Sequence, residues 1–189
     1  DFRNEINNFV SCSLKNIDRF KNQRVKLAAF VSSVDHRISK KGTGWGKFIF
    51  QDFEGELELS LFGEDYMKLK HLMEPGMSLY LMGNYQQNKW KETKEFELQL
   101  TEVKQLASVM EAMTDSISIQ VALNNINEAF VNQLEKLVKS NKGKHTLKLN
   151  VVSPELQNSV LFVSKNYKVK VSNELMDELK AIGVECKLN

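Results

Sequence analysis

The sequence contains few cysteines and histidines and no long apolar run. Of its 189 residues, two are cysteines, Cys12 and Cys186, and three are histidines. They do not fall at the spacing that a zinc site requires, so we expect no metal. No apolar stretch is long enough to span a bilayer and no signal peptide is visible, so we expect no membrane partner. With so few cysteines, a reducing cytoplasmic compartment is the expected location.

Catalytic motifs are missing as well. Neither cysteine has a histidine at a spacing typical of a nucleophile and its base. The sequence has no glycine-rich phosphate-binding loop of the P-loop or dinucleotide type. Glu56 and Glu58 stand two positions apart, but no histidine accompanies them, so they do not predict a metal or acid–base site. We therefore expect no catalytic residue and no cofactor within this chain.

The charge of the chain is nearly balanced. The formal net charge is +2, so no basic field over the whole molecule favours nucleic acid, and any electrostatic attraction must be local. The chain begins at Asp1 without a methionine, inside what looks like a helix. We expect it to be a segment of a longer protein.

Residues 24–104 alternate apolar and polar side chains in five short runs, which is typical of half-buried strands joined by turns. A stripe at helical spacing that ends before Pro75 and Gly76 predicts a helix between the third and fourth strands. This order predicts a five-stranded OB-fold barrel over residues 24–108. The predicted strands are 24–34, 47–52, 56–62, 77–86 and 96–103, and the predicted helix is 66–73.

Two further regions flank this predicted barrel. Residues 1–23 carry apolar side chains at helical spacing and predict a helical linker from an upstream domain. Residues 114–189 predict a small α+β domain with the order strand, helix, three strands, helix. Ser172 or Asn173 is expected to cap the last helix, and Gly183 to end it. The fold class is therefore mainly β followed by α+β, with domain strands at 117–123, 147–151, 161–163 and 169–171, the last two separated by a turn next to Tyr167.

Two basic loops, each with one tryptophan, are the candidate binding site. In an OB barrel the loops after the first and fourth strands flank one binding face. Lysine and arginine there would contact phosphate, and each tryptophan would stack on a base, worth roughly 1–3 kcal/mol. The first loop also has Gly42, Gly44 and Gly46, which allow close backbone approach to a ligand. The predicted nucleic-acid-binding residues are Arg37, Lys40, Lys41, Trp45, Lys47, Lys89, Trp90, Lys91 and Lys94.

Acidic residues on the third predicted strand limit this site. If the leucines of that strand face the core, Glu56 and Glu58 face outward, where carboxylates repel phosphate. Residues 24–104 also hold 12 basic and 12 acidic residues. Binding is therefore expected to be weak and to run over the loops more than across the sheet. The alternative, in which both loops are solvated hairpin tips, stays open.

The predicted barrel resembles the OB domain of the bacterial replicative DNA polymerase III alpha subunit. That family has a Thr-Lys-Lys-Gly loop, matched by Ser-Lys-Lys-Gly at 39–42, and an Asp-x-x-Gly turn, matched at 52–55. In both, a strand with alternating glutamates follows and ends in phenylalanine, here 56–62. Ser39 replaces the usual threonine, and Trp45 stands where the family often has proline or a smaller residue. Further matching segments are 63–66 and 75–76.

The resemblance extends over nearly the whole chain and implies a role in replication. Residues 1–3 resemble the segment after the family's helix-hairpin-helix region, and residues 117–189, with Gly143, resemble the alpha subunit's C-terminal domain. The parent protein would be a DNA-directed DNA polymerase with its catalytic aspartates in an upstream palm domain, so this fragment is expected to be inert alone. By resemblance, the barrel contacts single-stranded DNA template near the active site. The C-terminal domain would bind the tau subunit of the clamp loader. The upstream polymerase domains of the same chain would be a further partner.

Two other functions fit an OB barrel. A barrel that binds only proteins accords with the acidic third strand and the balanced charge. An anticodon-binding barrel of an aminoacyl-tRNA synthetase would need a class II catalytic domain after it, and residues 105–189 are too short and lack its motifs. Salt-dependent oligonucleotide binding separates the DNA-binding hypothesis from the protein-binding one.

Overall fold

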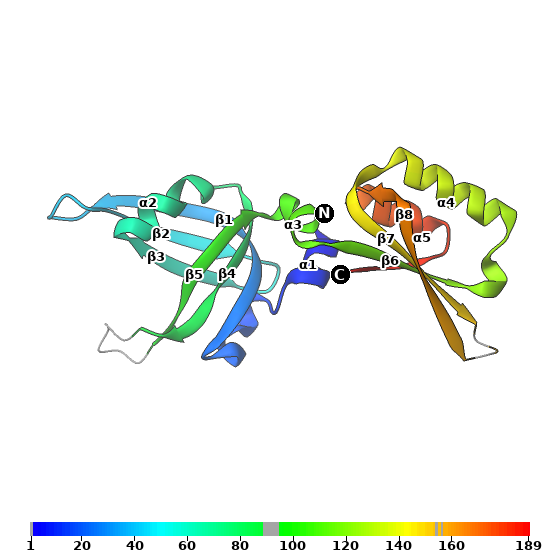
Figure 1. Ribbon diagram of the computed structural model, residues 1–189. Helices are drawn as coiled ribbons and strands as arrows, with labels where there is room; N and C mark the ends of the chain where they lie inside the picture. Colours follow the sequence, from blue (N-terminus) through cyan, green and yellow to red (C-terminus); the bar gives the residue numbers. More distant parts are fainter. Residues whose placement is uncertain (1, 89–94, 154, 156) are drawn as a thin grey trace. The chain divides into compact units, whose positions relative to one another are not determined.

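Five antiparallel strands form the sheet of residues 1–109, the first of two units into which the computed structural model of the chain divides. The structure describes residues 2–88, 95–153, 155 and 157–189. All five strands predicted for this unit are present, and the first is longer than expected (Figure 1). They are β1 (Gln23–Ile38), β2 (Gly44–Gln51), β3 (Glu56–Phe62), β4 (Ser78–Gln87) and β5 (Phe96–Gln105).

The sheet does not close into the predicted barrel. The strand order is β3-β2-β1-β4-β5, so within the described residues β3 and β5 are unpaired edges. A groove of about 340 Å³ lies between them, lined by Phe62 on one side and Gln99 on the other. Asp65 and Leu69 of helix α2 (Gly63–Leu69) line the same groove. Side chains rather than ladder hydrogen bonds therefore fill this seam, and the unit is an OB-like sheet with an open edge.

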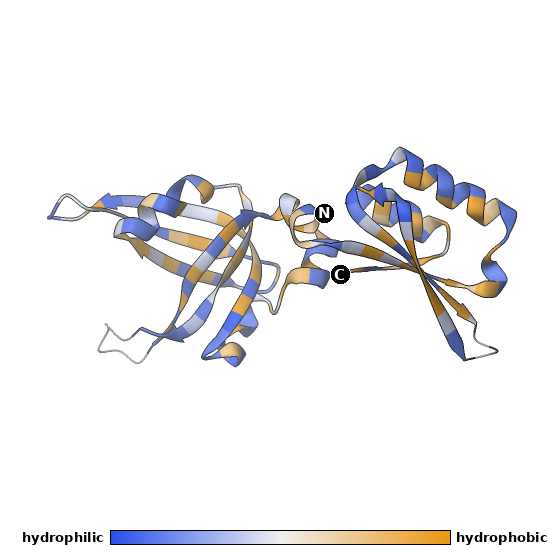
Figure 2. Ribbon diagram, in the orientation of Figure 1, coloured by the Kyte–Doolittle hydropathy of each residue, from blue (hydrophilic) through white to orange (hydrophobic). Residues whose placement is uncertain are grey.

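Alternation along the strands separates the core of this unit from its outer surface. Phe48 and Phe50 of β2 are fully buried, whereas their neighbours Lys47 and Ile49 are partly exposed. The same alternation is visible as bands of apolar and polar residues along the strands (Figure 2). Burying each large apolar side chain contributes about 1.5–3 kcal/mol, so the period of two fixes which face turns inward.

The N-terminal segment completes the core of this unit. Residues 1–23 contain helix α1 (Arg3–Phe9) and a 3₁₀ helix, η1 (Leu14–Phe20), so the helical prediction is confirmed. Leu14 and Ile17 are buried in the same apolar cluster as the strand residues. The segment is thus part of the packed unit, while its origin in an upstream domain stays a prediction.

The Asp52 side chain ties η1 to the turn between β2 and β3. Its Oδ1 accepts hydrogen bonds from the backbone N–H groups of Glu54, at 2.8 Å, and Gly55, at 2.7 Å. This is the tight turn that the Asp-x-x-Gly pattern predicts. Its Oδ2 accepts from the backbone N–H of Leu14 at 2.6 Å. A β-carbon at Gly55 would lie 2.9 Å from the backbone nitrogen of Lys15, so close packing of η1 also requires glycine here.

The second unit, residues 110–189, is an α+β domain with a mixed four-stranded sheet. Its strand order is β8-β7-β6-β9, with β6 and β7 parallel and the other neighbours antiparallel. No described helix combines the length and apolar composition that a bilayer crossing needs. The elements are β6 (Ser116–Ala122), η3 (Leu123–Asn125), α4 (Glu128–Ser140), β7 (Lys142–Ser153), β8 (Asn158–Val169), α5 (Asn173–Ala181) and β9 (Glu185–Leu188).

Three details of this region differ from the prediction. The two short strands expected around 161–163 and 169–171 are one continuous strand, β8, and the expected turn at Tyr167 is wrong. Helix α3 (Leu106–Met113), which spans the boundary between the two predicted domains, and strand β9 were not predicted. The cap of α5 is confirmed, because the Ser172 side chain accepts a hydrogen bond from the backbone N–H of Leu175.

A buried histidine crosslinks this second unit. His145 of β7 is 2% exposed. Its Nδ1 lies 3.1 Å from the carbonyl oxygen of Val169 and its Nε2 lies 3.0 Å from that of Glu111. Each ring nitrogen thus lies within hydrogen-bonding distance of a backbone carbonyl, one at the end of β8 and the other in α3.

Candidate nucleic-acid interface

The hairpin of β1 and β2 carries the first predicted loop, and most of that loop is strand. Because β1 ends at Ile38 and β2 begins at Gly44, only residues 39–43 form the turn. Ser39 closes this turn: its carbonyl accepts from the Gly42 N–H at 2.9 Å, and its hydroxyl accepts from the Thr43 N–H at 3.1 Å. The other predicted binding residues of this hairpin therefore sit on a sheet surface rather than in a loop.

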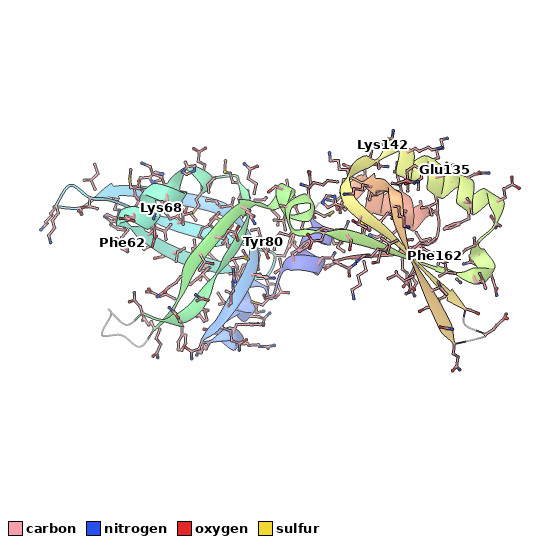
Figure 3. All side chains as sticks on the ribbon, viewed as in Figure 1. Phe62, Lys68, Tyr80, Glu135, Lys142 and Phe162 are labelled. Atoms are coloured by element: carbon pink, nitrogen blue, oxygen red, sulfur yellow. The ribbon has the colours of Figure 1, made fainter. Side chains whose placement is uncertain are left out.

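An aromatic pair forms the centre of this surface. Arg37, Trp45 and Phe62 lie opposite one another on β1, β2 and β3, so their side chains share the outer face. The Trp45 and Phe62 rings stack with centroids 5.3 Å apart and planes inclined by 18°. The Arg37 guanidinium lies 5.4 Å from the indole centroid, a cation–π distance. Phe62, labelled in Figure 3, is 60% exposed.

Two of the predicted cations on this face have carboxylate partners. The Arg37 guanidinium binds Asp35, with Nε and Nη2 at 2.7 Å and 2.5 Å from Oδ2. The hydrogen bond and then the charge of Asp35 raise the pKa of Arg37 above its ordinary value. Lys47 Nζ lies 2.7 Å from Oε2 of Glu58 on the neighbouring strand. The strand surface next to the aromatic pair is therefore close to electrically neutral.

Lys40 and Lys41 supply the positive charge of this site. Both are exposed in the 39–43 turn, and neither forms a salt bridge with any residue that the structure describes. Their hairpin continues directly into β2, which holds Trp45 of the aromatic pair. The remaining predicted residues, Lys89, Trp90, Lys91 and Lys94, lie outside the described residues.

The glycines of β2 serve packing, not ligand approach. A β-carbon at Gly44 would lie 2.9 Å from Cε1 of Tyr66, and one at Gly46 would lie 2.9 Å from Cε2 of the same ring. Tyr66 of α2 is buried, and its hydroxyl lies 3.0 Å from Nδ1 of His36. The prediction that these two glycines admit a ligand is therefore corrected. Gly42, with φ of +77°, allows the turn itself.

Phe62 is the member of this surface that sequence reasoning missed. The strand Glu56–Phe62 alternates, and the leucines face inward, so Phe62 must face outward with Glu58. An apolar ring at an outward position of a strand is a signal that the sequence alone could have given.

Within the described parts of the chain, no three histidine, cysteine, aspartate or glutamate side chains gather as a metal site.

Comparisons with known proteins agree with the two units. Residues 25–106 match the family model of an OB-fold nucleic acid binding domain, and residues 117–189 match that of the DNA polymerase III alpha subunit, C-terminal domain. The chain joins an OB-fold nucleic acid binding domain to a C-terminal domain of the DNA polymerase III alpha subunit. The resemblance is thus confirmed as an OB-fold nucleic acid binding domain followed by a DNA polymerase III alpha C-terminal domain. A comparison with curated proteins found no match.

Solved structures share parts of this chain at low similarity. An asparaginyl-tRNA synthetase of Entamoeba histolytica, in complex with asparaginyl-adenylate, is 19% identical with a TM-score of 0.35, and the match covers 50% of this chain. The chain spans 23% of that synthetase. The SSB domain of a Synechococcus protein is 20% identical with a TM-score of 0.31, over 42% of this chain and 91% of the other. A small single-stranded DNA-binding protein of Streptomyces coelicolor is 8% identical with a TM-score of 0.27, over 44% and 94%.

Proposed function

We propose that the OB-fold domain binds single-stranded DNA weakly, as the template-contacting domain of a replicative polymerase. The observation that carries the proposal is the stack of the half-buried Trp45 on the exposed Phe62, near the lysines of the 39–43 turn. A stacked aromatic pair on a sheet offers a π-face to any base, and base stacking is worth roughly 1–3 kcal/mol. Lys40 and Lys41 would contact the phosphates of the same strand.

The order of side chains along β2 and β3 supports a path of the DNA near the turn between β1 and β2. Trp45 pairs with Phe62 at the end of β2 and β3 that adjoins the 39–43 turn, whereas Ile49 pairs with Glu58 and Gln51 with Glu56 towards the β2–β3 turn. The carboxylates lie at the far end and would repel phosphate. DNA would therefore cross the aromatic pair and turn away over the 39–43 loop, as the balanced charge led us to expect.

The C-terminal domain is proposed to dock replisome subunits, the tau subunit of the clamp loader among them. This part of the proposal rests on the family match over residues 117–189. The fragment would be catalytically inert, would act in the cytoplasm, and would serve a polymerase active site on upstream domains. A protein-binding role for the OB domain is the second candidate, favoured by the salt bridges that neutralise Arg37 and Lys47.

Fluorescence anisotropy with labelled single-stranded DNA at low and high salt tests the DNA-binding proposal. The wild-type chain is compared with a variant carrying Lys40→Ala and Lys41→Ala and with one carrying Trp45→Ala. Loss of two phosphate contacts should make the slope of log affinity against log salt shallower by about 1.4. The Trp45→Ala variant should bind roughly tenfold more weakly, with the salt slope unchanged.

Matched variants decide whether the effect belongs to this site. Lys136→Ala with Lys187→Ala removes the same charge from exposed positions of the C-terminal domain. This control should bind DNA as the wild type does. If the wild type binds no DNA even at low salt, or if the control loses as much affinity as the loop variant, the OB domain is a protein-docking module.

A further inference from the structure

An edge strand of the C-terminal domain exposes four consecutive apolar side chains. Val160, Leu161, Phe162 and Val163 of β8 are 54%, 56%, 54% and 52% exposed. Val160 and Phe162 pair with Val151 and Leu149 of β7, while Leu161 pairs with Asn150. Successive residues point to opposite faces, so the strand exposes apolar side chains on both faces of the sheet.

This stretch of β8 has none of the features that usually protect a sheet edge. Such edges are blunted by charged residues, proline or bulges. Residues 158–163 read Asn-Ser-Val-Leu-Phe-Val, with no charge and no proline. The register shifts in the β7–β8 pairing lie at Lys142–His145 and Thr146–Lys148, so pairing from Lys148 with Val163 to Ser153 with Asn158 is regular.

The outer side of β8 is open to a further strand. In the described part of the domain β8 is the last strand of the order β8-β7-β6-β9, so its outward N–H and C=O groups have no ladder partner. The β7–β8 hairpin extends past α4 and α5 in Figure 1. Phe162, labelled in Figure 3, lies on this strand. An apolar edge that is regularly paired on its inner side over residues 158–163 is a template for strand addition.

Lysines surround the apolar edge. Residues 142–170 contain six lysines and one glutamate, Glu155, for a formal charge of +5. Lys165 and Lys168 follow the apolar run on β8 and are exposed, and Lys148 stands opposite Val163. Among the described residues, only Lys144 of these six forms a salt bridge, with Glu111. An occupant of this edge must therefore carry negative charge as well as apolar side chains.

We propose that β8 is a docking edge for an acidic partner protein, which adds a strand of apolar residues flanked by aspartate or glutamate. Main-chain hydrogen bonds to residues 158–163 would supply affinity, and the side chains of Val160 and Phe162 would supply specificity. The lysines would steer the acidic ends of that strand. The inference deepens the docking half of the proposed function and rests on it.

Charge and side-chain chemistry exclude two other occupants of this edge. A second copy of the chain would bring another +5 hairpin alongside the first, and like charges oppose that pairing. Single-stranded nucleic acid would satisfy the lysines, but it offers no partner for aliphatic side chains on both faces, and Phe162 is the single aromatic in the run.

The test uses the full chain and a short synthetic peptide, with valine and isoleucine at its centre and aspartate and glutamate at both ends. Two control peptides accompany it. One has every central amide N-methylated, so it cannot donate to β8, and the other has lysine in place of its acids. Binding is measured by calorimetry, and hydrogen exchange reports protection of the amides of residues 158–163. The acidic peptide should bind and protect these amides. The affinity of each control peptide should be lower by roughly tenfold or more.

Variants locate the site on the chain. Phe162→Lys and Leu161→Lys place a charge on either face of the exposed edge and should each weaken peptide binding by about tenfold or more. Phe53→Lys, at a turn residue of the OB domain that is 97% exposed, is the matched control and should leave peptide binding unchanged. Circular dichroism confirms that each variant is folded.

Several outcomes would overturn the proposal. They are no binding of the acidic peptide, equal binding of the N-methylated or the lysine peptide, displacement of the peptide by single-stranded DNA, and self-association that Phe162→Lys abolishes. The same preparations are titrated with DNA, where Trp45→Ala should matter and Phe162→Lys should not. Failure of peptide docking is therefore separable from failure of the proposed DNA binding.

Discussion

The ammonium group of Lys47 lies 2.7 Å from Oε2 of Glu58, across the β2–β3 pair. Both side chains are partly exposed, at 38% and 54%, and exposed pairs of this kind contribute about 0–1 kcal/mol to stability. Their main effect is on the electrostatics of the proposed DNA face, because the carboxylate neutralises a cation that lies two residues from Trp45 on β2.

Glu58→Gln should therefore strengthen DNA binding. The amide keeps the size of the side chain but releases Lys47 for a phosphate contact, so affinity at low salt should rise and the salt slope should steepen by about 0.7. Anisotropy titrations at several salt concentrations measure both quantities. An unchanged slope would mean that DNA does not reach Lys47. Lys104, paired with Glu102 at 2.7 Å on β5, provides the matched control, and Glu102→Gln should have no such effect.

Trp45→Ala and Phe62→Ala should weaken DNA binding together rather than independently. The rings stack on each other, so removal of either one removes the support of the other as well as a surface for the base. Each single variant should lose about tenfold in affinity, and the double variant should lose less than the product. Strict additivity of the two losses would show that the rings contact separate bases.

Gly46→Ala should destabilise the OB domain. The new methyl group would lie 2.9 Å from Cε2 of Tyr66 and 3.0 Å from Cε2 of Phe48, both in rings that are buried. Overpacking of this kind costs typically about 1–3 kcal/mol in the free energy of unfolding. Urea denaturation measures the change. Combined with Tyr66→Ala, the glycine substitution should cost less than it does alone, since the ring that it meets is gone.

Tyr85→Phe should alter stability in alkaline solution. Burial first, and then the hydrogen bond to Oδ1 of Asp18 at 2.7 Å, raise the pKa of Tyr85 to about 12. The pKa of a tyrosine in an unfolded chain is about 10, so the folded state holds the phenolic proton more tightly. The stability that this contributes is complete below pH about 10 and is lost as the pH rises towards 12.

Denaturation curves across this pH range test the Tyr85 prediction. The wild type should lose stability above pH about 10, and Tyr85→Phe should lose less over the same interval. At neutral pH the variant should be less stable by about 1–3 kcal/mol, because Asp18 loses its hydrogen-bond donor. Equal pH profiles for the two proteins would show that other groups govern alkaline unfolding.

The strands of the OB domain were predictable because one face of each is buried. Alternation such as that of β3 has a period of two only when every second residue reaches the core. The same rule failed at β8, where apolar residues occupy both faces of an exposed edge and the pairing with β7 shifts register. Apolar content there does not report burial, so one strand was divided into two.

The binding surface was predicted in its residues but not in its geometry. Trp45 and Lys40 were found from composition, since aromatic and basic side chains near glycines are typical of nucleic-acid contacts. The role of Gly44 and Gly46 depends on Tyr66. This residue follows β3 in the sequence and contacts the two glycines only in the folded domain. Salt bridges such as that of Lys47 with Glu58 likewise depend on strand register, which a single sequence leaves open.

The hydrogen bond from Leu14 to Asp52 has a practical consequence for anyone who expresses the OB domain by itself. A recombinant boundary at the first strand, Gln23, would delete Leu14 and Ile17 and leave two holes in the apolar interior. It would also remove the backbone N–H of Leu14, which donates a hydrogen bond to Oδ2 of Asp52 at the β2–β3 turn. Such a truncated protein would aggregate or unfold, whereas one that starts at or before Ser13 retains the 3₁₀ helix that fills this part of the core.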